Sequence, residues 1–224
     1  AEARHKAGEF VSVDGDHIVF VPNATYGVNA VARSLKLEPG DEVLTTDHEY
    51  GAVNNTWQFL CERSGAKYIN QTIPLPFESP EAVVDKLWEG VTERTKVIAF
   101  SHITSPTALI LPAELICKRA NEEGIITVID GAHALGQIDL DLGAMQPTFY
   151  TGNAHKWLCA PKGAAVLYAA PGFDDVLEPL VVSHGWTHGD SGSKLIDYFS
   201  WTGTMDPSAY LSVPAAIAFQ KEHN

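Results

Sequence analysis

The sequence predicts an α/β fold: three layers, in which a mostly parallel, seven-stranded sheet carries helices on both faces. Short apolar runs alternate along the chain with segments of helical periodicity. Five of the apolar runs are unbroken, as in strands that are buried on both faces. The chain has 224 residues, 45% hydrophobic and 19% charged, which suits one globular domain over 1–224.

Each element of this fold is assigned to a segment of the sequence. The segments that predict strands are 18–22, 42–46, the first part of 66–75, 96–100, 125–130, 149–150 and 163–169. The segments that predict helices are 23–35, 49–63, 79–91 and 112–124.

Residues that begin and end helices support these boundaries. Asn23 and Ser79 stand where N-caps are preferred, just before the first helical residues. Pro112 suits the first turn of the fourth helix. Gly65 and Gly124 follow the last turns of two helices, where a left-handed residue is common.

Charge and composition exclude several classes of partner. The formal charge is 15 − 28 = −13, which argues against binding to nucleic acid. No apolar run reaches the roughly 20 residues that span a bilayer, and the charged segment 1–10 is unlike a signal peptide. Cys61, Cys117 and Cys159 form no CxxC pair and no disulfide framework. We therefore expect a cytoplasmic protein.

Polar side chains follow the predicted strands at their carboxyl ends. In open α/β sheets, ligands bind outside this edge, so side chains delivered there are candidates for a site. The polar residues that we expect at this edge are Asn23, Thr25, His48, Glu49, Tyr50, Ser101, His102, Asp130, His133, His155 and Lys156.

Four kinds of group at this edge match the needs of pyridoxal phosphate. A partly desolvated lysine such as Lys156 is a nucleophilic amine, able to form a Schiff base with an aldehyde. A strand-end carboxylate such as Asp130 can pair with a protonated pyridine nitrogen. A helix N-terminus carrying the Thr25 hydroxyl binds phosphate, and an aromatic ring or a histidine covers the cofactor ring. These residues predict a pyridoxal phosphate site.

Five segments then resemble the class V aminotransferase family of fold type I pyridoxal phosphate enzymes, in the family's order. They are NATYGVN, TTDHEYGAV, VIDGAHALGQ, HKW and WTGTMDPSAYLSVPAAIAF. Within the family, DHEYGA, SHITSPTAL and GNAHKWLCAPKG are most similar to the branch of isopenicillin N epimerases and hercynylcysteine sulfoxide lyases, which is related to cysteine desulfurases. The resemblance implies a large-domain core over 1–224, without the family's N-terminal segment and C-terminal small domain.

The resemblance implies a role for each residue that matches a family motif. Lys156 would hold the cofactor and move the α-proton, and Asp130 would pair with the pyridine nitrogen. His133 would lie near the ring hydroxyl. Either His48 or Tyr50 would stack on the ring, because the alignment of this segment allows both.

Further residues would bind the cofactor phosphate. The family's motifs place the backbone N–H of Ala24, the Thr25 side chain and His155 there, with Thr151 or Asn153 as a further contact. Gly203 and Thr204 would reach the phosphate of the partner's cofactor, which implies a homodimer.

The implied activity is chemistry at the α-carbon of a small amino-acid substrate. Epimerisation and C–S cleavage both fit the branch, and Tyr50 is a candidate proton donor for cleavage. A non-catalytic pyridoxal phosphate-binding module and a cysteine desulfurase are the alternatives. No nucleotide-binding glycine motif is present, and His48, His102, His133 and His155 form no HxxxH or HxH pair, so a nucleotide or metal site is not expected from them.

Several other side chains have a simpler interpretation. We expect His102 and Cys159 to be structural and Trp157 to pack against its surroundings. Trp186 and Trp201 lie in an aromatic stretch that suits a subunit interface.

Overall fold

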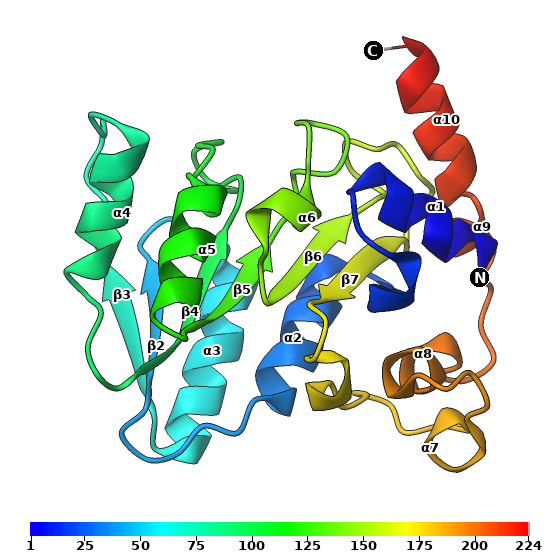
Figure 1. Ribbon diagram of the computed structural model, residues 1–224, viewed down its shortest axis with the longest axis horizontal. Helices are drawn as coiled ribbons and strands as arrows, with labels where there is room; N and C mark the ends of the chain where they lie inside the picture. The colour runs from blue at the N-terminus through cyan, green and yellow to red at the C-terminus, as the bar shows by residue number, and fades with distance from the viewer. Residues whose placement is uncertain (224) are drawn as a thin grey trace.

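A single sheet of seven strands organises the computed structural model, which describes residues 1–223 (Figure 1). The strand order is β1-β7-β6-β5-β4-β2-β3. The strands are β1 (Ile18–Val21), β2 (Glu42–Thr46), β3 (Lys67–Gln71), β4 (Thr95–Ser101), β5 (Ile126–Asp130), β6 (Phe149–Asn153) and β7 (Ala165–Ala169). Only β7 runs opposite to its neighbours, β1 and β6. The predicted fold class, a mostly parallel seven-stranded sheet, is confirmed.

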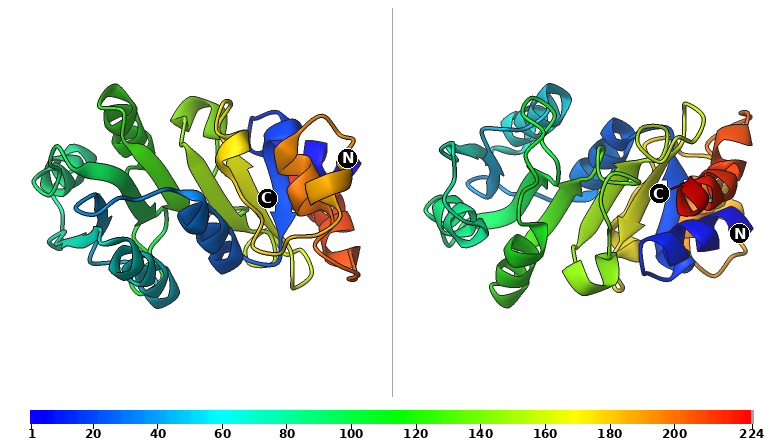
Figure 2. Two further views of the ribbon diagram at one scale, coloured as in Figure 1. Left: turned by 90° about the horizontal axis from the view of Figure 1, so that it is seen from below. Right: turned by 90° about the horizontal axis from the view of Figure 1, so that it is seen from above.

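Helices cover both faces of the twisted sheet (Figure 2). The helices that share one core are α1 (Glu2–Phe10), α4 (Pro80–Trp88), α5 (Ala113–Glu122), α6 (Leu142–Met145) and α10 (Val213–His223). The helices that share the other core are α2 (Ala24–Ser34), α3 (Gly51–Ser64) and α8 (Lys194–Ser200). The remaining short elements are η1 (Gly15–His17), η2 (Asp174–Val176), α7 (Gly185–His188) and α9 (Ser208–Leu211).

The two cores are divided by the alternation of side chains along each strand. In β4, Ile98 and Phe100 belong to the core under α4 and α5, whereas Val97 and Ala99 belong to the core under α2 and α3. All four are almost fully buried. Successive residues of a strand point to opposite faces, so a strand covered on both faces must be apolar throughout. This is why the unbroken apolar runs predicted the central strands.

The predicted caps form. The Asn23 side chain accepts a hydrogen bond from the N–H of Tyr26 at 2.8 Å, and the Ser79 hydroxyl accepts one from the N–H of Ala82 at 3.2 Å. Gly65 ends α3 with φ +77°, in the left-handed region that glycine adopts without strain. The Asn23 and Ser79 caps satisfy N–H groups that the start of a helix otherwise leaves unpaired.

Two of the boundaries that differ from the prediction lie beside the carboxyl edge of the sheet. The helix expected over 49–63 begins at Gly51, because Glu49 is held by side chains at the ends of two strands. The strand that contains Phe149 and Tyr150 continues to Asn153, so residues expected in a loop belong to β6.

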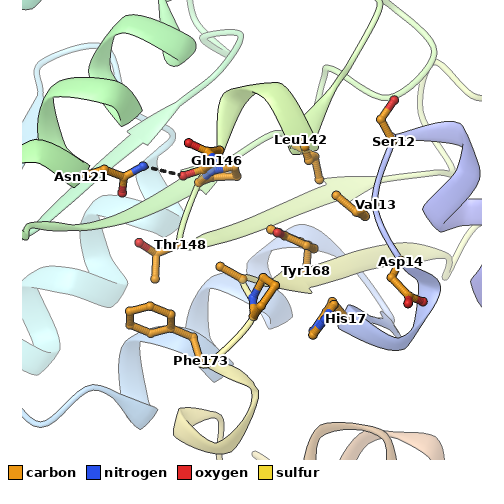
Figure 3. A pocket seen from close by; sticks show the side chains of 14 residues that line it. Ser12, Val13, Asp14, His17, Asn121, Leu142, Gln146, Thr148, Tyr168 and Phe173 are labelled. Atoms are coloured by element: carbon orange, nitrogen blue, oxygen red, sulfur yellow. Dashed lines mark hydrogen bonds between the residues drawn. The ribbon is translucent and has the colours of Figure 1, made fainter.

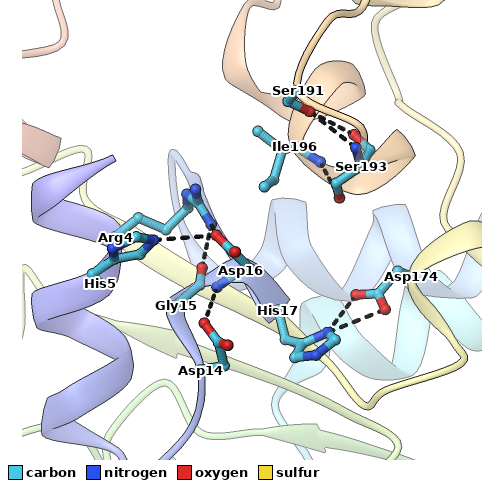
Figure 4. A network of polar contacts seen from close by, with 10 residues as sticks. All are labelled: Arg4, His5, Asp14, Gly15, Asp16, His17, Asp174, Ser191, Ser193 and Ile196. Carbon is cyan, nitrogen blue, oxygen red and sulfur yellow. Dashed lines mark hydrogen bonds and ion pairs between the residues drawn. The ribbon is translucent and has the colours of Figure 1, made fainter.

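Polar contacts fasten the N-terminal segment to the rest of the fold (Figure 4). Arg4 of α1 donates hydrogen bonds to the carbonyl of Gly15 and to the Asp16 carboxylate. His17 Nδ1 lies 2.9 Å from the Asp174 carboxylate, which joins the start of β1 to η2. Over residues 1–223, no helix combines the length and apolar character that a membrane crossing requires.

Candidate active site

A cavity of about 140 Å³ lies at the carboxyl edge of the sheet, where β4, β5 and β6 end beside the start of α2. Its lining consists of Ala24, Thr25, Tyr50, Ser101, Ile103, Ser105, Asp130, Ala132, His133, Asn153 and Lys156. Seven of the candidate residues from the sequence are among them. The candidates outside the lining are His48, Thr151, His155, Gly203 and Thr204.

Lys156 enters the cavity from the turn that follows β6. Its amine nitrogen lies 3.0 Å from His133 Nε2. Partial burial lowers the pKa of the Lys156 amine, and the charge of Asp130 opposes that shift. A lowered pKa increases the share of the neutral amine, which is the nucleophilic form.

Asp130 ends β5 and is only 6% exposed. Ser101 of β4 and Thr151 of β6 are its neighbours across the sheet. The Asp130 carboxylate accepts a hydrogen bond from the N–H of Ala132 at 3.0 Å. Burial raises the pKa of this carboxyl, and the Ala132 N–H and the charge of Lys156 oppose the shift. A buried carboxylate without a full counter-charge is suited to a cationic ligand group.

The start of α2 offers one free backbone donor to the cavity. The N–H of Ala24, which we expected at the phosphate, is donated to Asn153 Oδ1 at 2.8 Å. The N–H of Tyr26 is donated to the Asn23 cap. Within residues 1–223 the N–H of Thr25 has no hydrogen-bond partner. Thr25 is therefore the residue of this turn whose N–H and hydroxyl can both bind an anion.

The two candidates for covering a cofactor ring lie differently. Tyr50 lines the cavity and is 48% exposed. The His48 ring is turned elsewhere: its Nε2–H donates to the carbonyl of Ile73 at 2.9 Å, and the same nitrogen lies 3.4 Å from the Asp47 carboxylate. The structure brings Tyr50, and not His48, to the cavity.

Thr151 and His155 lie behind the lining. The Thr151 hydroxyl donates to the carbonyl of Val166 at 2.9 Å, and its side chain lies against Gly27, where an added Cβ would meet it. His155 Nδ1–H donates to the carbonyl of Ala164 at 2.7 Å, which leaves Nε2 as its second polar atom. Thr151 therefore supports the packing of α2 on β6.

Gly203 and Thr204 belong to the segment between α8 and α9. Thr204 is exposed, and Gly203 has φ +124°, in the region that favours glycine. Neither residue contributes to the cavity of its own chain.

Glu49 is a buried acid to which the sequence analysis assigned no role. It accepts hydrogen bonds from Thr46 Oγ1 at 2.5 Å and from Ser101 Oγ at 2.6 Å. Burial raises the pKa of Glu49 to about 7, although both hydroxyls act against the shift. A sequence pattern could have indicated this contact: Thr46 and Ser101 are hydroxyl residues at the ends of two predicted strands, and Glu49 follows the first of them closely. Glu49 and Ser101 therefore form a second polar layer behind the cavity.

His102 is a structural residue, in agreement with its interpretation from the sequence. It is 5% exposed, and its Nδ1 lies 3.0 Å from the Tyr150 hydroxyl. Burial lowers the pKa of His102 to about 4. Among residues 1–223, no three His, Cys, Asp or Glu side chains stand close enough to hold a metal ion.

A larger cavity of about 610 Å³ lies at the opposite edge of the sheet (Figure 3). Thr148, just before β6, and Ala170, just after the antiparallel β7, mark that edge. Tyr168 and His17 also line it. It does not bring a lysine and an acid together. The smaller cavity at the carboxyl edge is therefore the candidate active site.

The residues around that cavity fit pyridoxal phosphate. An amine with a lowered pKa, a buried carboxylate and an unpaired N–H at a helix start lie in one lining. They match the aldehyde, the pyridine nitrogen and the phosphate of the cofactor in turn.

Comparisons with known proteins agree with this chemistry. The chain is 36% identical over 232 residues to isopenicillin N epimerase of Streptomyces clavuligerus, covering 99% of this chain and 58% of that protein. It is 28% identical over 224 residues to hercynylcysteine sulfoxide lyase of Schizosaccharomyces pombe, covering 97% of this chain and 57% of that protein. The chain therefore spans about half the length of the curated relatives that it matches.

A solved structure shares the fold. It is a variant of a protein with glycine covalently linked to its pyridoxal phosphate cofactor. It aligns with a TM-score of 0.86 at 22% identity, covering 100% of this chain and 60% of that one. Residues 1–208 match the family described as Aminotransferase class-V, whose enzymes use pyridoxal phosphate, and this chain belongs to that family.

Proposed function

We propose that this chain carries the pyridoxal phosphate site of an enzyme that acts at the α-carbon of an amino acid, as an epimerase or a C–S lyase. The observation that carries the proposal is the convergence of Lys156, Asp130 and His133 in one cavity at the carboxyl edge. Identity of 36% to an isopenicillin N epimerase supports this branch of the family. Residues 1–224 form the large domain in this proposal.

The cofactor, when bound, draws electron density from the α-carbon of an attached amino acid, so that its proton can leave. Lys156 is the residue that holds the cofactor aldehyde and accepts the α-proton at Nζ. Asp130 supplies the negative charge that keeps the pyridine nitrogen protonated. Burial makes that charge effective, because little water screens it.

Other residues bind and orient the cofactor. Tyr50 covers the ring in this proposal, in place of His48, and its hydroxyl is the candidate proton donor. The N–H and hydroxyl of Thr25 bind the phosphate. His155 joins them through Nε2, because its Nδ1–H is already donated to the carbonyl of Ala164. Asn153 holds the turn by its contact with Ala24.

The second subunit completes the site in this proposal. Gly203 and Thr204 lie on an exposed segment that can reach a partner's phosphate, so we expect a homodimer. The three cysteines are free thiols, which suits the cytoplasm.

A visible absorption spectrum tests the cofactor and the lysine together. We expect purified protein with added pyridoxal phosphate to show an absorption band that survives dialysis. Lys156→Ala should lose the band, and Lys162→Ala, which changes an exposed lysine nearby, should keep it. A folded wild-type protein without the band would contradict the proposal.

The substrate class needs two assays on the longest available form of the protein. Deuterium exchange at the α-carbon with loss of chirality reports epimerisation, and release of a thiol or persulfide reports C–S cleavage. A cysteine desulfurase is the alternative for the second outcome, although none of Cys61, Cys117 and Cys159 lines the cavity. Cofactor binding with neither activity would favour a non-catalytic module.

A further inference from the structure

Trp157 has an unexpected position beside the candidate lysine. Its side chain is 51% exposed, although an indole of this size is commonly buried. Its Nε1–H donates to His133 Nδ1 at 3.4 Å. The other nitrogen of the same ring, Nε2, lies 3.0 Å from Lys156 Nζ. Trp157, His133 and Lys156 thus form a chain of hydrogen bonds that ends in the cavity.

The loops that carry these residues are held together by backbone contact. Gly136, with φ +78°, lies so close to the 157–158 backbone that an added Cβ would be 2.7 Å from Leu158 N. A side chain at this position would separate the loops that carry His133 and Trp157. The close approach of the two loops therefore fixes the distance between Trp157 Nε1 and His133 Nδ1.

The direction of each hydrogen bond follows from the chemistry of the indole. An indole nitrogen can only donate, so His133 Nδ1 must accept and cannot carry a proton. A neutral imidazole has one N–H, which must then be on Nε2. Nε2–H donates to Lys156 Nζ, and Nζ accepts with a lone pair. Only the neutral amine has that lone pair, because an ammonium group can only donate.

The opposite arrangement is disfavoured by the same contact. An ammonium at Lys156 would need Nε2 as acceptor, which would place the imidazole proton on Nδ1. Nδ1–H would then face the Trp157 N–H, two donors toward each other. Turning the ring over would place carbon atoms where both nitrogens now bond, so the ring orientation is settled by its two partners.

The charged surroundings agree with this arrangement. Burial lowers the pKa of His133, and a charge on Lys156 would add to the effect, so the neutral ring is favoured in either case. Asp130 and Tyr50 are the other titratable groups that line the cavity. The charge of Asp130 raises the pKa of Lys156 and so favours its ammonium form. The hydrogen bond from Trp157 to His133 acts in the opposite direction, toward the neutral amine.

We propose that Trp157 is a positioning residue, which holds His133 as the Nε2–H tautomer and thereby favours the neutral amine of Lys156. This rests on the proposed function, in which Lys156 is the amine that holds the cofactor aldehyde. The neutral amine is the form able to bond to an aldehyde. The same Nε2–H is the donor that a cofactor ring oxygen needs from His133.

Nitrogen-15 NMR of the imidazole rings tests the tautomer on the full chain without cofactor. A protonated and an unprotonated ring nitrogen have distinct chemical shifts, and His133→Gln identifies the signals of His133 by their loss. We expect Nε2 protonated and Nδ1 unprotonated in the wild type. A proton on Nδ1 would overturn the proposal, whether or not any variant folds.

Trp157→Phe keeps the ring packing and removes the donor. We expect the preference for the Nε2–H tautomer to fall about threefold to tenfold, the share that one hydrogen bond contributes. Trp186→Phe, which changes another exposed indole far along the chain, should leave the His133 signals unchanged. An unchanged tautomer in Trp157→Phe, with its fold verified by circular dichroism, would also overturn the proposal.

A second readout connects the tautomer to the cofactor. We expect Trp157→Phe to take up pyridoxal phosphate about threefold to tenfold more slowly below neutral pH, with the difference shrinking at high pH where the amine is neutral in both proteins. If Lys156→Ala also takes up the cofactor with the same band, the proposed function fails, whereas the tautomer measured by NMR still decides the role of Trp157.

Discussion

Asn153 Oδ1 accepts a hydrogen bond from the backbone N–H of Ala24 at 2.8 Å, between residues that lie 129 positions apart in the chain. This contact joins the end of β6 to the first turn of α2. Both residues are buried and both line the candidate active site. The contact therefore fixes the position of Thr25 relative to Lys156.

Removal of this acceptor should weaken both the fold and the cofactor site. Asn153→Ala leaves the buried N–H of Ala24 unpaired, which is expected to lower the free energy of unfolding by about 1–3 kcal/mol. The dissociation constant for pyridoxal phosphate should rise roughly tenfold, because the Thr25 donor is no longer held. Chemical unfolding and a cofactor titration measure the two effects.

Asn153→Asp is the matched control. It keeps an oxygen acceptor for the Ala24 N–H, so we expect much of the stability to return. The added negative charge lies near the proposed phosphate position, so cofactor affinity should stay low. Equal cofactor affinity in Asn153→Asp and the wild type would place the phosphate elsewhere.

Glu49 should make stability depend on pH. Its folded-state pKa of about 7 lies above the ordinary 4.5, so the folded protein keeps a proton that the unfolded chain releases between these pH values. The stabilisation is therefore present at low pH, and the free energy of unfolding falls as the pH rises from about 4.5 to about 7. The shift corresponds to about 3 kcal/mol.

Glu49→Gln isolates this effect, because it cannot ionise. The difference in unfolding free energy between the variant and the wild type should move in favour of the variant as the pH rises from 5 to 8. Taking the difference removes the contribution of His102, which titrates in the same protein. Glu93→Gln, an exposed acid, should stay within about 0.5 kcal/mol of the wild type. A difference that is flat with pH would mean that Glu49 ionises normally.

The sequence was sufficient to predict the sheet, because burial on both faces leaves a direct mark on composition. β4 and β7 are recognisable as apolar runs without knowledge of their neighbours. Asp130 and Lys156 could be predicted as site residues for a related reason. Parallel strands of a sheet end at the same edge, so the residues that directly follow them lie near one another for many loop conformations.

Features that depend on side-chain direction could not be predicted in this way. His48 and Tyr50 are two residues apart, and only the backbone between β2 and α3 decides which one faces the cavity. The Ala24 N–H was expected to bind the cofactor phosphate, but it donates to Asn153 Oδ1 at the end of β6. No local sequence pattern indicates a contact between residues so far apart in the chain. The sequence predicted only that Trp157 packs against its surroundings. Its hydrogen bond to His133 could not be predicted, because the bond depends on the approach of two loops at Gly136.

The different positions of Tyr50 and His48 give a third prediction. Tyr50→Ala removes an aromatic ring from the cavity lining, and the dissociation constant for pyridoxal phosphate should rise about threefold to tenfold. Tyr50→Phe should restore affinity, since the ring remains. If the hydroxyl is the proton donor, turnover should remain low in Tyr50→Phe.

His48→Ala provides the comparison. It removes a hydrogen bond to the carbonyl of Ile73, so the free energy of unfolding should fall by about 1 kcal/mol. Cofactor affinity should match that of the wild type. The reverse pattern, with weak binding in His48→Ala and normal binding in Tyr50→Ala, would assign the ring contact to His48.

The fourth prediction concerns Asp130, whose effect on thermal stability should differ between the protein with cofactor and the protein without it. Burial raises the pKa of Asp130, so its ionisation destabilises the cofactor-free protein as the pH rises through the folded-state pKa. Asp130→Asn removes that penalty and keeps the oxygen that accepts from the Ala132 N–H. The variant should therefore melt at a higher temperature than the wild type at neutral pH when no cofactor is present.

Pyridoxal phosphate should reverse that order. A protonated pyridine nitrogen beside Asp130 compensates the buried charge, so the cofactor should stabilise the wild type more than Asp130→Asn. Turnover in the variant should fall by about a hundredfold or more, because a charge fixed at the reacting group is lost. Thermal melts with and without cofactor measure the first effect, and Asp130→Glu shows whether charge alone suffices. If the cofactor stabilises Asp130→Asn as much as the wild type, Asp130 does not pair with the cofactor, and its burial has only a structural cause.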